Sequence, residues 1–570
     1  MFWRFLFFYH VCLLVLCNAT SSPRKDLVII LDCSKSISRN TFSHDINFLK
    51  NLVNHLSISP SSVRVAMVTF ASKAKIEFNF EQYVNRECVL KRLKKIQRRP
   101  RKGRTNIDAA LRKAVYLFNS YQGFAKDKEI YLISDGKFNE GKYPDESLKT
   151  LNKLGVKIQV LAVGKNPDFK ELRAIASISG EDHFTRLKND RKTHKNIIFK
   201  LAHRKEPYTK CKRRGTILDE CNRECQCSNG FMKNCQRVRR EFTTFTDEEK
   251  KRYLQAYFKI TTVEPLKSRF IKFIRKHAVY FWSGIHKRYQ FFPWHRWYVY
   301  QFENLMREVD CRITVPFWDW SYWSPVAWKV GVHIWTNDEY GFGGDGKESR
   351  QYCVQTGPFN ESAWSHPATE KVKRVMSSIM EVTGQCQTPV SNTTHYKRCL
   401  RRSFNKVCPN VAHVLQTIGI PCTDFKRFDY TVRETYHNDL HNQIGGQMSS
   451  EYAANAPEFF LHHGLLDNIW YRWQMKGPAC QFAYFPKNVS KLLDAPFKTT
   501  DFVNSSNQGH CVSVRYDKFL DRVIPVGADV GKPSLPDSYL CFKDAKSKDE
   551  MPKSAFTLLK EQMRNEKDDD

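Results

Sequence analysis

The sequence predicts a multidomain protein in which an α/β doubly wound domain is followed by a mainly α-helical bundle. Its 570 residues are too many for one compact core. The first 200 or so residues alternate short apolar runs with helical patterns, whereas the middle of the chain carries histidines on longer amphipathic patterns. Apolar residues make up 41% of the chain, which is enough for extensive burial.

The N-terminal domain is expected to span 24–203 and to contain a parallel sheet. Short runs that are apolar throughout are typical of strands buried on both faces of such a sheet. These runs lie at 27–31, 63–70, 129–134 and 156–163. Helical patterns such as 47–56 and 106–118 separate them, and this alternation favours the doubly wound arrangement.

Side chains with oxygen ligands lie just beyond the predicted strands. Asp32, Ser34 and Ser36 form D-x-S-x-S after the first strand; Thr105 precedes a helical pattern, and Asp135 follows the third strand. Sites in open α/β sheets form at the carboxyl ends of strands. Hydroxyls with one or two carboxylates suit a hard ion such as Mg²⁺, which keeps positions for a partner's carboxylate. The alternative is a domain that keeps its fold around a vestigial ion site.

This pattern resembles the von Willebrand factor type A domain and its metal-dependent adhesion site, over roughly Asp26 to His203. One departure is Cys33, where that family usually has glycine. Cys88 is the other cysteine of the domain, so a Cys33–Cys88 disulfide could form and distort the ion site.

A cysteine-rich basic linker is expected at 204–240. It contains no C-x-x-C pair, and disulfides are favoured over a metal site in an oxidising compartment. Its cysteines are Cys211, Cys221, Cys225, Cys227 and Cys235. Five is an odd number, so at least one should pair outside the linker, with Cys311 as a candidate.

The second domain is expected to span 241–480 and to begin with a helix capped by Thr246. His277, His286 and His295 follow at intervals of nine residues, or two and a half helical turns. In one straight helix, successive histidines at this spacing would point to opposite sides. The three side chains can therefore converge only if the chain turns between them.

Apolar periodicity predicts how the chain makes that turn. It places His277 and His295 on the inward faces of two helices, the second opened by Pro293, and His286 in the loop between them.

A second histidine set lies downstream. His437 and His441 have the i, i+4 spacing that aims two imidazoles at one metal. In the helical pattern EFFLHHGLLDNIWYRW, the apolar phase selects His463 over His462 as the third member. Asp467, one turn on, is a candidate to orient a ligand or a nearby guanidinium.

Two sets of three imidazoles without a thiolate favour two copper ions, with zinc possible on ligand type alone. Structural zinc would need one closed four-ligand site. Paired copper ions can bind O₂ and oxidise a phenol, given a dry aromatic pocket that stacks the substrate ring. Candidates for that pocket are Phe292, Trp294, Phe459 and Phe460. The plainer alternative is that all six histidines are structural.

Four stretches resemble the signatures of tyrosinases, which belong with catechol oxidases and haemocyanins to the type 3 copper proteins. They are HKRYQFFPWHRWYVYQFE, VPFWDW, YHNDLHNQIGGQM and NAPEFFLHHGLLDNIW. The resemblance implies a helical bundle housing a dicopper site, in which His277, His286 and His295 bind copper A. By the same resemblance, copper B is bound by His437, His441 and His463.

The resemblance also implies roles around the copper ions. Asn438 matches a position linked to deprotonating monophenols, and Glu434 is a candidate to hold the assisting water. Two departures stand out. Gly284 replaces the cysteine with which many relatives form a thioether to a histidine, and NAPEFF replaces the commoner D-P form, which affects how Glu458 and the substrate entrance are arranged.

Residues 1–19 read as a secretory signal peptide, and no later stretch approaches the roughly 20 apolar residues of a membrane span. The 16 cysteines that remain (18 − 2) indicate disulfides in an oxidising compartment. Residues 481–570 read as a C-terminal extension and tail. Glycosylation sequons occur at Asn360, Asn392, Asn488 and Asn504.

The formal net charge of +33 favours acidic partners such as matrix proteins or polysaccharides, and secretion argues against nucleic acid. The sequence therefore predicts a secreted dicopper oxidase of extracellular matrix that acts with O₂ on phenolic small molecules or tyrosyl side chains. It would hydroxylate monophenols, oxidise o-diphenols to o-quinones, or both, for crosslinking, sclerotisation or pigmentation. The alternatives are a non-enzymatic matrix protein that uses the copper fold as a scaffold, and a haemocyanin-like O₂-binding protein.

Overall fold

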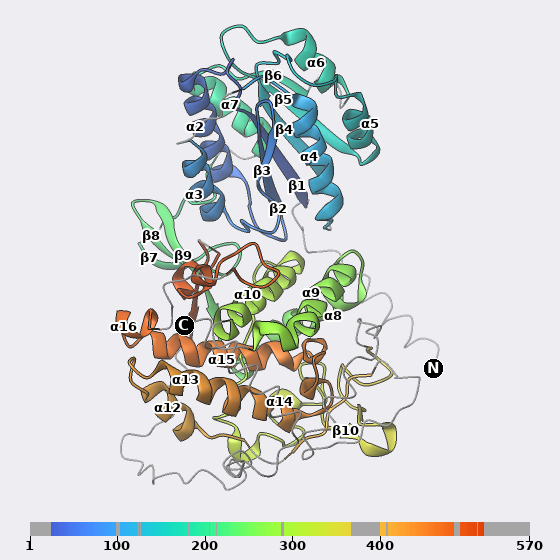
Figure 1. The fold of residues 1–570 in the computed structure, drawn as a ribbon, viewed down its shortest axis with the longest axis vertical. Coiled ribbons are helices and arrows are strands. Elements are labelled where there is room, and N and C mark those ends of the chain that lie inside the picture. Colours follow the sequence, from blue (N-terminus) through green and yellow to red (C-terminus); the bar gives the residue numbers. More distant parts are fainter. Residues whose placement is uncertain are drawn as a thin grey trace, which may run out of the picture. The chain divides into compact units, whose positions relative to one another are not determined.

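The fold comes from a computed structural model of the full chain (Figure 1). It describes residues 24–517, apart from 98–102, 124, 126, 179–182, 204–205, 213, 287–289, 366–398, 406–407, 484–490 and 510. The predicted signal peptide, the two sequons at Asn392 and Asn488, and the tail after residue 517 lie outside the described residues. The described chain divides into two compact units, one within Met1–Trp318 and Phe460–Asp517, the other within Asp319–Phe459.

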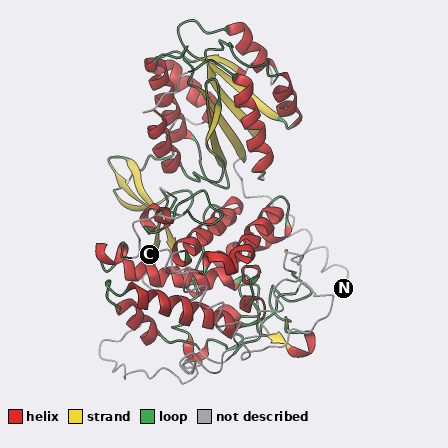
Figure 2. Cartoon of the chain, viewed as in Figure 1, coloured by secondary structure: helices red, strands yellow, loops and turns green. Residues whose placement is uncertain are grey.

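The first part of the chain forms a six-stranded sheet of order β3-β2-β1-β4-β5-β6, in which only β3 is antiparallel to its neighbour (Figures 1 and 2). Its strands are β1 (Lys25–Asp32), β2 (Val63–Phe70), β3 (Ala74–Phe78), β4 (Asp127–Ser134), β5 (Val156–Ala162) and β6 (Phe184–Arg186). Its helices are α2 (Arg39–His55), α3 (Arg86–Gln97), α4 (Ile107–Ser120), α5 (Asp145–Lys153), α6 (Phe169–Ser177) and α7 (Arg191–Ala202). The predicted doubly wound arrangement is confirmed.

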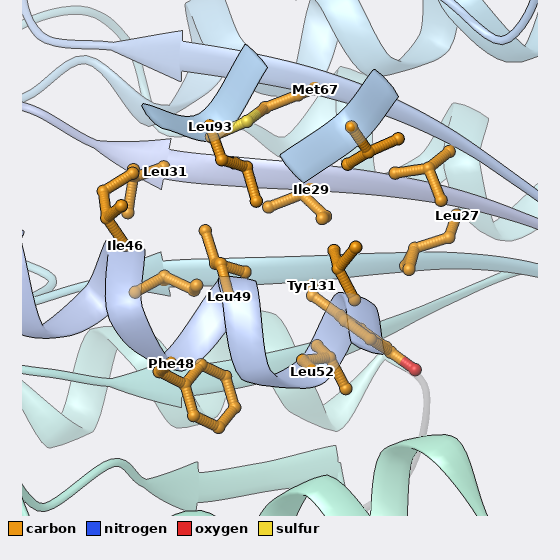
Figure 3. Packing of buried hydrophobic residues seen from close by; sticks show 14 of the residues in the cluster. Leu27, Ile29, Leu31, Ile46, Phe48, Leu49, Leu52, Met67, Leu93 and Tyr131 are labelled. Carbon is orange, nitrogen blue, oxygen red and sulfur yellow. The ribbon is translucent and has the colours of Figure 1, made fainter. Parts of the chain in front are cut away.

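Alternate residues of β1 enter two separate cores, which explains why this strand is apolar throughout. Leu27, Ile29 and Leu31 pack with residues of α2, α3 and α7 on one face (Figure 3). Val28 and Ile30 pack with residues of α4, α5 and α6 on the other face.

The cysteine-rich segment supplies three strands of a small sheet of order β12-β9-β8-β7, and β12 comes from the C-terminal part of the chain. Its strands are β7 (Gly215–Leu218), β8 (Glu224–Ser228), β9 (Phe231–Arg239) and β12 (Ser513–Tyr516). Disulfides join Cys211 to Cys227, Cys225 to Cys235 and Cys221 to Cys311. The predictions of disulfide stapling and of a link to Cys311 are confirmed.

The predicted Cys33–Cys88 disulfide is wrong. Cys88, on α3, is bonded to Cys511, which lies 423 residues away in the C-terminal part of the chain. Cys33 lies buried at the end of β1, where its Sγ donates to the carbonyl of Leu31 at 3.6 Å. No disulfide therefore distorts the oxygen-ligand loop.

Helices form the rest of the first unit: α8 (Asp247–Thr262), α9 (Leu266–Tyr280), α10 (Phe291–Val309), most of α15 (Glu458–Gln474) and α16 (Pro478–Gln481). Thr246 caps α8 in a reciprocal capping box with Glu249. Helix α10 begins at Phe291, two residues before the predicted start at Pro293. A proline is tolerated in the first turn because the N–H groups there have no partner within the helix.

The second unit contains α12 (Val411–Gly419), α13 (Phe425–Tyr430), α14 (Asp439–Ile444), and the paired strands β10 (Gly346–Lys347) and β11 (Cys353–Val354). Arg402 and Glu458 form a fully buried two-pronged ion pair at 2.8 and 2.9 Å. The guanidinium of Arg402 also donates to three successive carbonyls, those of Phe342, Gly343 and Gly344. Glu458 opens α15, so this pair fixes the start of that helix. Among the described residues, no helix is both long enough and apolar enough to cross a lipid bilayer.

Candidate metal centres

The first histidine set comes together in the first unit. His277 lies in the last turn of α9, and His295 lies in the first turns of α10. His286 directly follows a π-helical turn, Phe281–Ile285, that comes immediately after α9. The three ring centroids are 5.3, 5.9 and 5.1 Å apart, and one ring nitrogen of each lies within 4.8 Å of the others. The chain turns between the histidines as the nine-residue spacing requires.

Backbone carbonyls determine which nitrogen of two of these rings faces the metal position. Nδ1 of His286 lies 3.0 Å from the carbonyl of Phe281, and Nδ1 of His295 lies 2.8 Å from that of Phe291. A carbonyl oxygen only accepts, so each Nδ1 carries the proton and each Nε2 presents a lone pair. This is the neutral tautomer that binds a metal through Nε2. The donor set therefore fits a copper ion.

A buried network of charged groups holds the helix that carries His295. Arg296, the next residue, donates to Asp467 at 2.6 Å and stacks over Trp470 with its guanidinium carbon 3.7 Å from the ring centroid. Asp467 also accepts from the hydroxyl of Tyr516 at 2.5 Å and from Arg239 at 3.3 Å. Of the two roles predicted for Asp467, the structure shows the pairing with a guanidinium.

Glu303 lies at the other end of this network. Its carboxylate accepts from Arg237 at 2.7 Å, from Arg239 at 2.9 Å and from the backbone N–H of Val315 at 3.0 Å. Burial alone would raise the pKa of Glu303, but the neighbouring guanidinium groups lower it to about 2. Glu303 and Tyr516 could not be recognised from the sequence, because their partners are distant along the chain.

The second unit brings together two histidines of the second set. His437 lies in a π-helical stretch, Thr431–Asn438, and His441 lies in α14; their ring centroids are 4.5 Å apart. Nδ1 of His441 lies 2.6 Å from the carbonyl of Met448, so Nε2 again presents the lone pair.

The two residues predicted to assist catalysis form a chain that ends on His437. The amide oxygen of Asn438 accepts from Nδ1 of His437 at 2.7 Å, and its amide nitrogen donates to Glu434 at 2.6 Å. Glu434 also forms an ion pair with Arg433. The carboxylate of Glu434 is therefore linked to the imidazole of His437 through one amide.

The third member of the second set lies on α15. The ring of Phe459 meets the ring of His441 edge to face at 5.7 Å. His463 follows Phe459 by four residues, so the two share one side of the helix. The ring of His463 is stacked on the ring of His295, with centroids 4.7 Å apart and planes 11° from parallel.

The predicted pocket aromatics are all buried, but they contact different partners. Trp294 packs against the ring of His295 at 5.1 Å, and Phe459 contacts His441. Phe460 stacks on the core ring of Phe302 at 3.5 Å, and Phe292 packs on Trp470 at 4.8 Å. Phe292 and Phe460 thus contribute ring contacts to the core behind the histidines.

The predicted oxygen ligands of the N-terminal domain gather at the carboxyl ends of β1 and β4. Asp32 accepts from the backbone N–H of Ser34 at 2.8 Å and from the hydroxyl of Ser134 at 2.7 Å. The hydroxyls of Ser34 and Ser36 are 2.9 Å apart, and Ser36 donates to Asp135 at 3.2 Å. Burial, followed by the charge of Asp135, raises the pKa of Asp32 to about 6, against the effect of its hydrogen bonds.

Thr105 lies on the neighbouring loop, where its N–H donates to the side chain of Asn139 at 2.6 Å. Its hydroxyl is buried without a hydrogen-bond partner among the described residues, so its oxygen is available to coordinate a cation. Hydroxyls and carboxylates fit a hard divalent ion. Sequence reasoning missed Ser134, which directly precedes Asp135.

An α/β domain with an oxygen-ligand loop, joined to a helical region with buried histidine sets, defines a protein of two modules, each with candidate metal ligands. Residues 26–198 match the family model of the von Willebrand factor type A domain, and residues 267–476 match that of the common central domain of tyrosinase. One region of the chain therefore matches the von Willebrand factor type A domain and another matches the tyrosinase domain, and the tyrosinase family implies dicopper binding.

Two tyrosinases and a synthase are similar to part of this chain. A tyrosinase of Streptomyces glaucescens is 25% identical over 259 residues, which cover 42% of this chain and 84% of that protein. A tyrosinase of Aspergillus flavus is 29% identical over 265 residues, covering 42% and 64%. Grixazone synthase of Streptomyces griseus is 27% identical over 277 residues, covering 42% and 85%.

Two solved structures align with about a third of the chain. One is proximal thread matrix protein 1 from the mussel byssus, at 27% identity and a TM-score of 0.28, covering 32% of this chain and 46% of that one. The other is the manganese-loaded TRAP protein of Plasmodium vivax, at 20% identity and a TM-score of 0.28, covering 31% and 73%.

Proposed function

We propose that this chain is a secreted dicopper oxidase that converts phenols to o-quinones with O₂. The observation that carries the proposal is the convergence of His277, His286 and His295, two of them held by carbonyls in the metal-binding tautomer. Copper, when bound, would supply O₂ binding and the oxidising equivalents.

The second copper is assigned to His437, His441 and His463. The first two have rings 4.5 Å apart. His463 is proposed as the third ligand because its motif, NAPEFFLHHGLLDNIW, resembles that of the tyrosinases.

Deprotonation of the phenol is assigned to Glu434 and Asn438. A monophenol must lose its hydroxyl proton before it can bind a metal ion as a phenolate. Asn438 bonds to His437 through its oxygen and to Glu434 through its nitrogen, so the amide holds the carboxylate in a fixed position. Glu434 would accept the proton, directly or through one water.

The von Willebrand factor type A domain is proposed to place this chemistry in extracellular matrix. Asp32, Ser34, Ser36, Thr105 and Asp135 would hold a Mg²⁺ ion that an acidic matrix protein or polysaccharide completes. Quinones react with amines and thiols, so a basic oxidase held on acidic matrix would crosslink or tan it. The net charge of +33 supports the same class of partner.

Purified full-length chain, expressed with copper, is expected to hold about two copper ions and to form quinone from L-DOPA. Removal of copper by a chelator should abolish quinone formation, and addition of copper should restore it. Metal analysis by mass spectrometry and absorbance of the quinone provide the two measurements. A chain that holds copper but forms no quinone would favour the scaffold or O₂-binding alternatives, and a copper-free chain would exclude the oxidase.

Asp135→Ala is expected to remove Mg²⁺-dependent retention on an immobilised acidic polypeptide, because Asp135 helps to position Ser36 and contributes a ligand oxygen. Quinone formation from L-DOPA should be unchanged. Asp190→Ala, at the exposed start of α7, is the matched control and should keep both properties. Equal retention of wild type and Asp135→Ala, with and without EDTA, would contradict the adhesion proposal.

A further inference from the structure

The segment Lys491–Asp494, here called the strap, contacts each of the three stretches that carry the first histidine set. Next to His277, Lys276 donates to the side chain of Asp494 at 2.5 Å and to its backbone carbonyl at 3.1 Å. Next to His295, the indole N–H of Trp294 donates to the carbonyl of Leu493 at 3.0 Å.

The third contact is a close approach beside His286. Gly284 is buried two residues before His286, and a Cβ atom at this position would lie 2.8 Å from Cδ1 of Leu493. That distance is shorter than real Cβ contacts. The end of the Leu493 side chain therefore occupies this space and would have to shift to admit any residue other than glycine.

The strap is itself an ordered turn. The N–H of Leu492 donates to the carbonyl of Phe497 at 2.9 Å, the N–H of Ala495 donates to that of Leu492 at 3.2 Å, and the side chain of Leu492 is fully buried. These bonds let the strap act as a fixed surface against which the histidine-bearing stretches rest.

His286 depends on such a surface more than its two neighbours do. His277 and His295 lie on regular helices, whereas His286 follows a single π-helical turn. Its position is set by the bond from Nδ1 to the carbonyl of Phe281 and by how the chain lies at Gly284.

We propose that Leu493 is a positioning residue for the first metal site, wedged against Gly284 so that the Phe281–His286 turn stays closed and His286 faces His277 and His295. The strap lies in the C-terminal part of the chain and contacts all three of the stretches that carry the first histidine set. This inference rests on the proposed function only in that the site is expected to hold copper.

The wedge predicts that the effects of two substitutions, Leu493→Ala and Gly284→Ala, are not additive. Leu493→Ala leaves a gap beside the turn, and Gly284→Ala forces either the turn or the end of the Leu493 side chain to shift. Each is expected to speed copper loss to a chelator by about tenfold or more, the usual effect of removing a group that orients a metal ligand. The double variant should lose copper more slowly than Gly284→Ala alone, because the shortened side chain makes room for the new methyl group.

The test measures copper loss from the full-length chain by stopped-flow competition with a chromogenic chelator. The matched control is Leu148→Ala, the same substitution at a buried leucine of α5; it should lower the melting temperature and leave the rate of copper loss unchanged. Leu493→Met, which conserves volume, should stay close to wild type.

A second measurement, on the metal-free chain, separates the wedge from the copper claim. Hydrogen exchange of the amides of residues 281–286 should be faster in both single variants than in wild type. In the double variant it should be slower than in Gly284→Ala. If exchange follows this order while wild type binds no copper, the proposed function fails and the wedge stands. The wedge proposal would be overturned if Leu493→Ala exchanged its amides and lost copper at the wild-type rates. It would also be overturned if the double variant lost copper faster than either single variant.

Discussion

His295→Ala is expected to lower quinone formation from L-DOPA by at least about a thousandfold, as removal of one member of a catalytic unit usually does. His295 is buried in the first histidine set, and its ring is stacked on His463 at 4.7 Å. Its loss would remove a ligand from the first site and a packing surface from a ligand of the second. Bound copper should fall from about two ions per chain to one or fewer.

His413→Ala is the matched control for this substitution. His413 is a partly exposed histidine on α12, outside both sets. This variant should keep its copper and its activity. Full copper occupancy together with wild-type turnover in His295→Ala would show that the first set is not the catalytic site.

Glu303→Ala is expected to lower the free energy of unfolding by about 3–5 kcal/mol, the cost of removing one partner from a buried ion network. The substitution would leave Arg237 and Arg239 buried without the carboxylate that both contact, and would remove the acceptor of the Val315 N–H. Urea unfolding followed by fluorescence measures the change. Glu248→Ala, at an exposed site on α8, should change stability by less than about 0.5 kcal/mol.

The pH dependence of stability gives an independent check on the same residue. Because the folded-state pKa of Glu303 is lowered to about 2 from 4.5, its contribution is present above pH 4.5 and is lost as the pH falls towards 2. Glu303→Gln should therefore show a shallower loss of stability between these values than wild type. Parallel acid-unfolding curves for the two proteins would contradict this assignment.

The sequence predicted those features that depend on local pattern. Buried strands such as β1 are apolar throughout because both faces are covered, and this can be read without knowing the neighbours. The inward direction of His277 followed from its place on the apolar face of α9. The loop after β1 could be assigned to an ion because strand ends fix where such ligands meet.

The features that the sequence did not predict depend on contacts between distant residues. Cys88 could be matched with Cys33 by proximity in sequence, whereas its partner Cys511 is brought close only by the complete fold. The contact of Leu493 with Gly284 has no periodic signal, because a strap without regular secondary structure shows no pattern. The start of α10 before Pro293 reflects the tolerance of a first helical turn for proline.

Strand β12 has a consequence for biosynthesis. Its residue Tyr516 bonds to Asp467, and Asp467 holds Arg296 beside His295. Tyr516 is made 221 residues after His295 (516 − 295 = 221), which at about 5–20 residues per second takes roughly 10–40 s of translation. The ribosome therefore delivers His277, His286 and His295 well before the strand that completes their support. We expect copper to be acquired by the finished chain, after translation rather than during it.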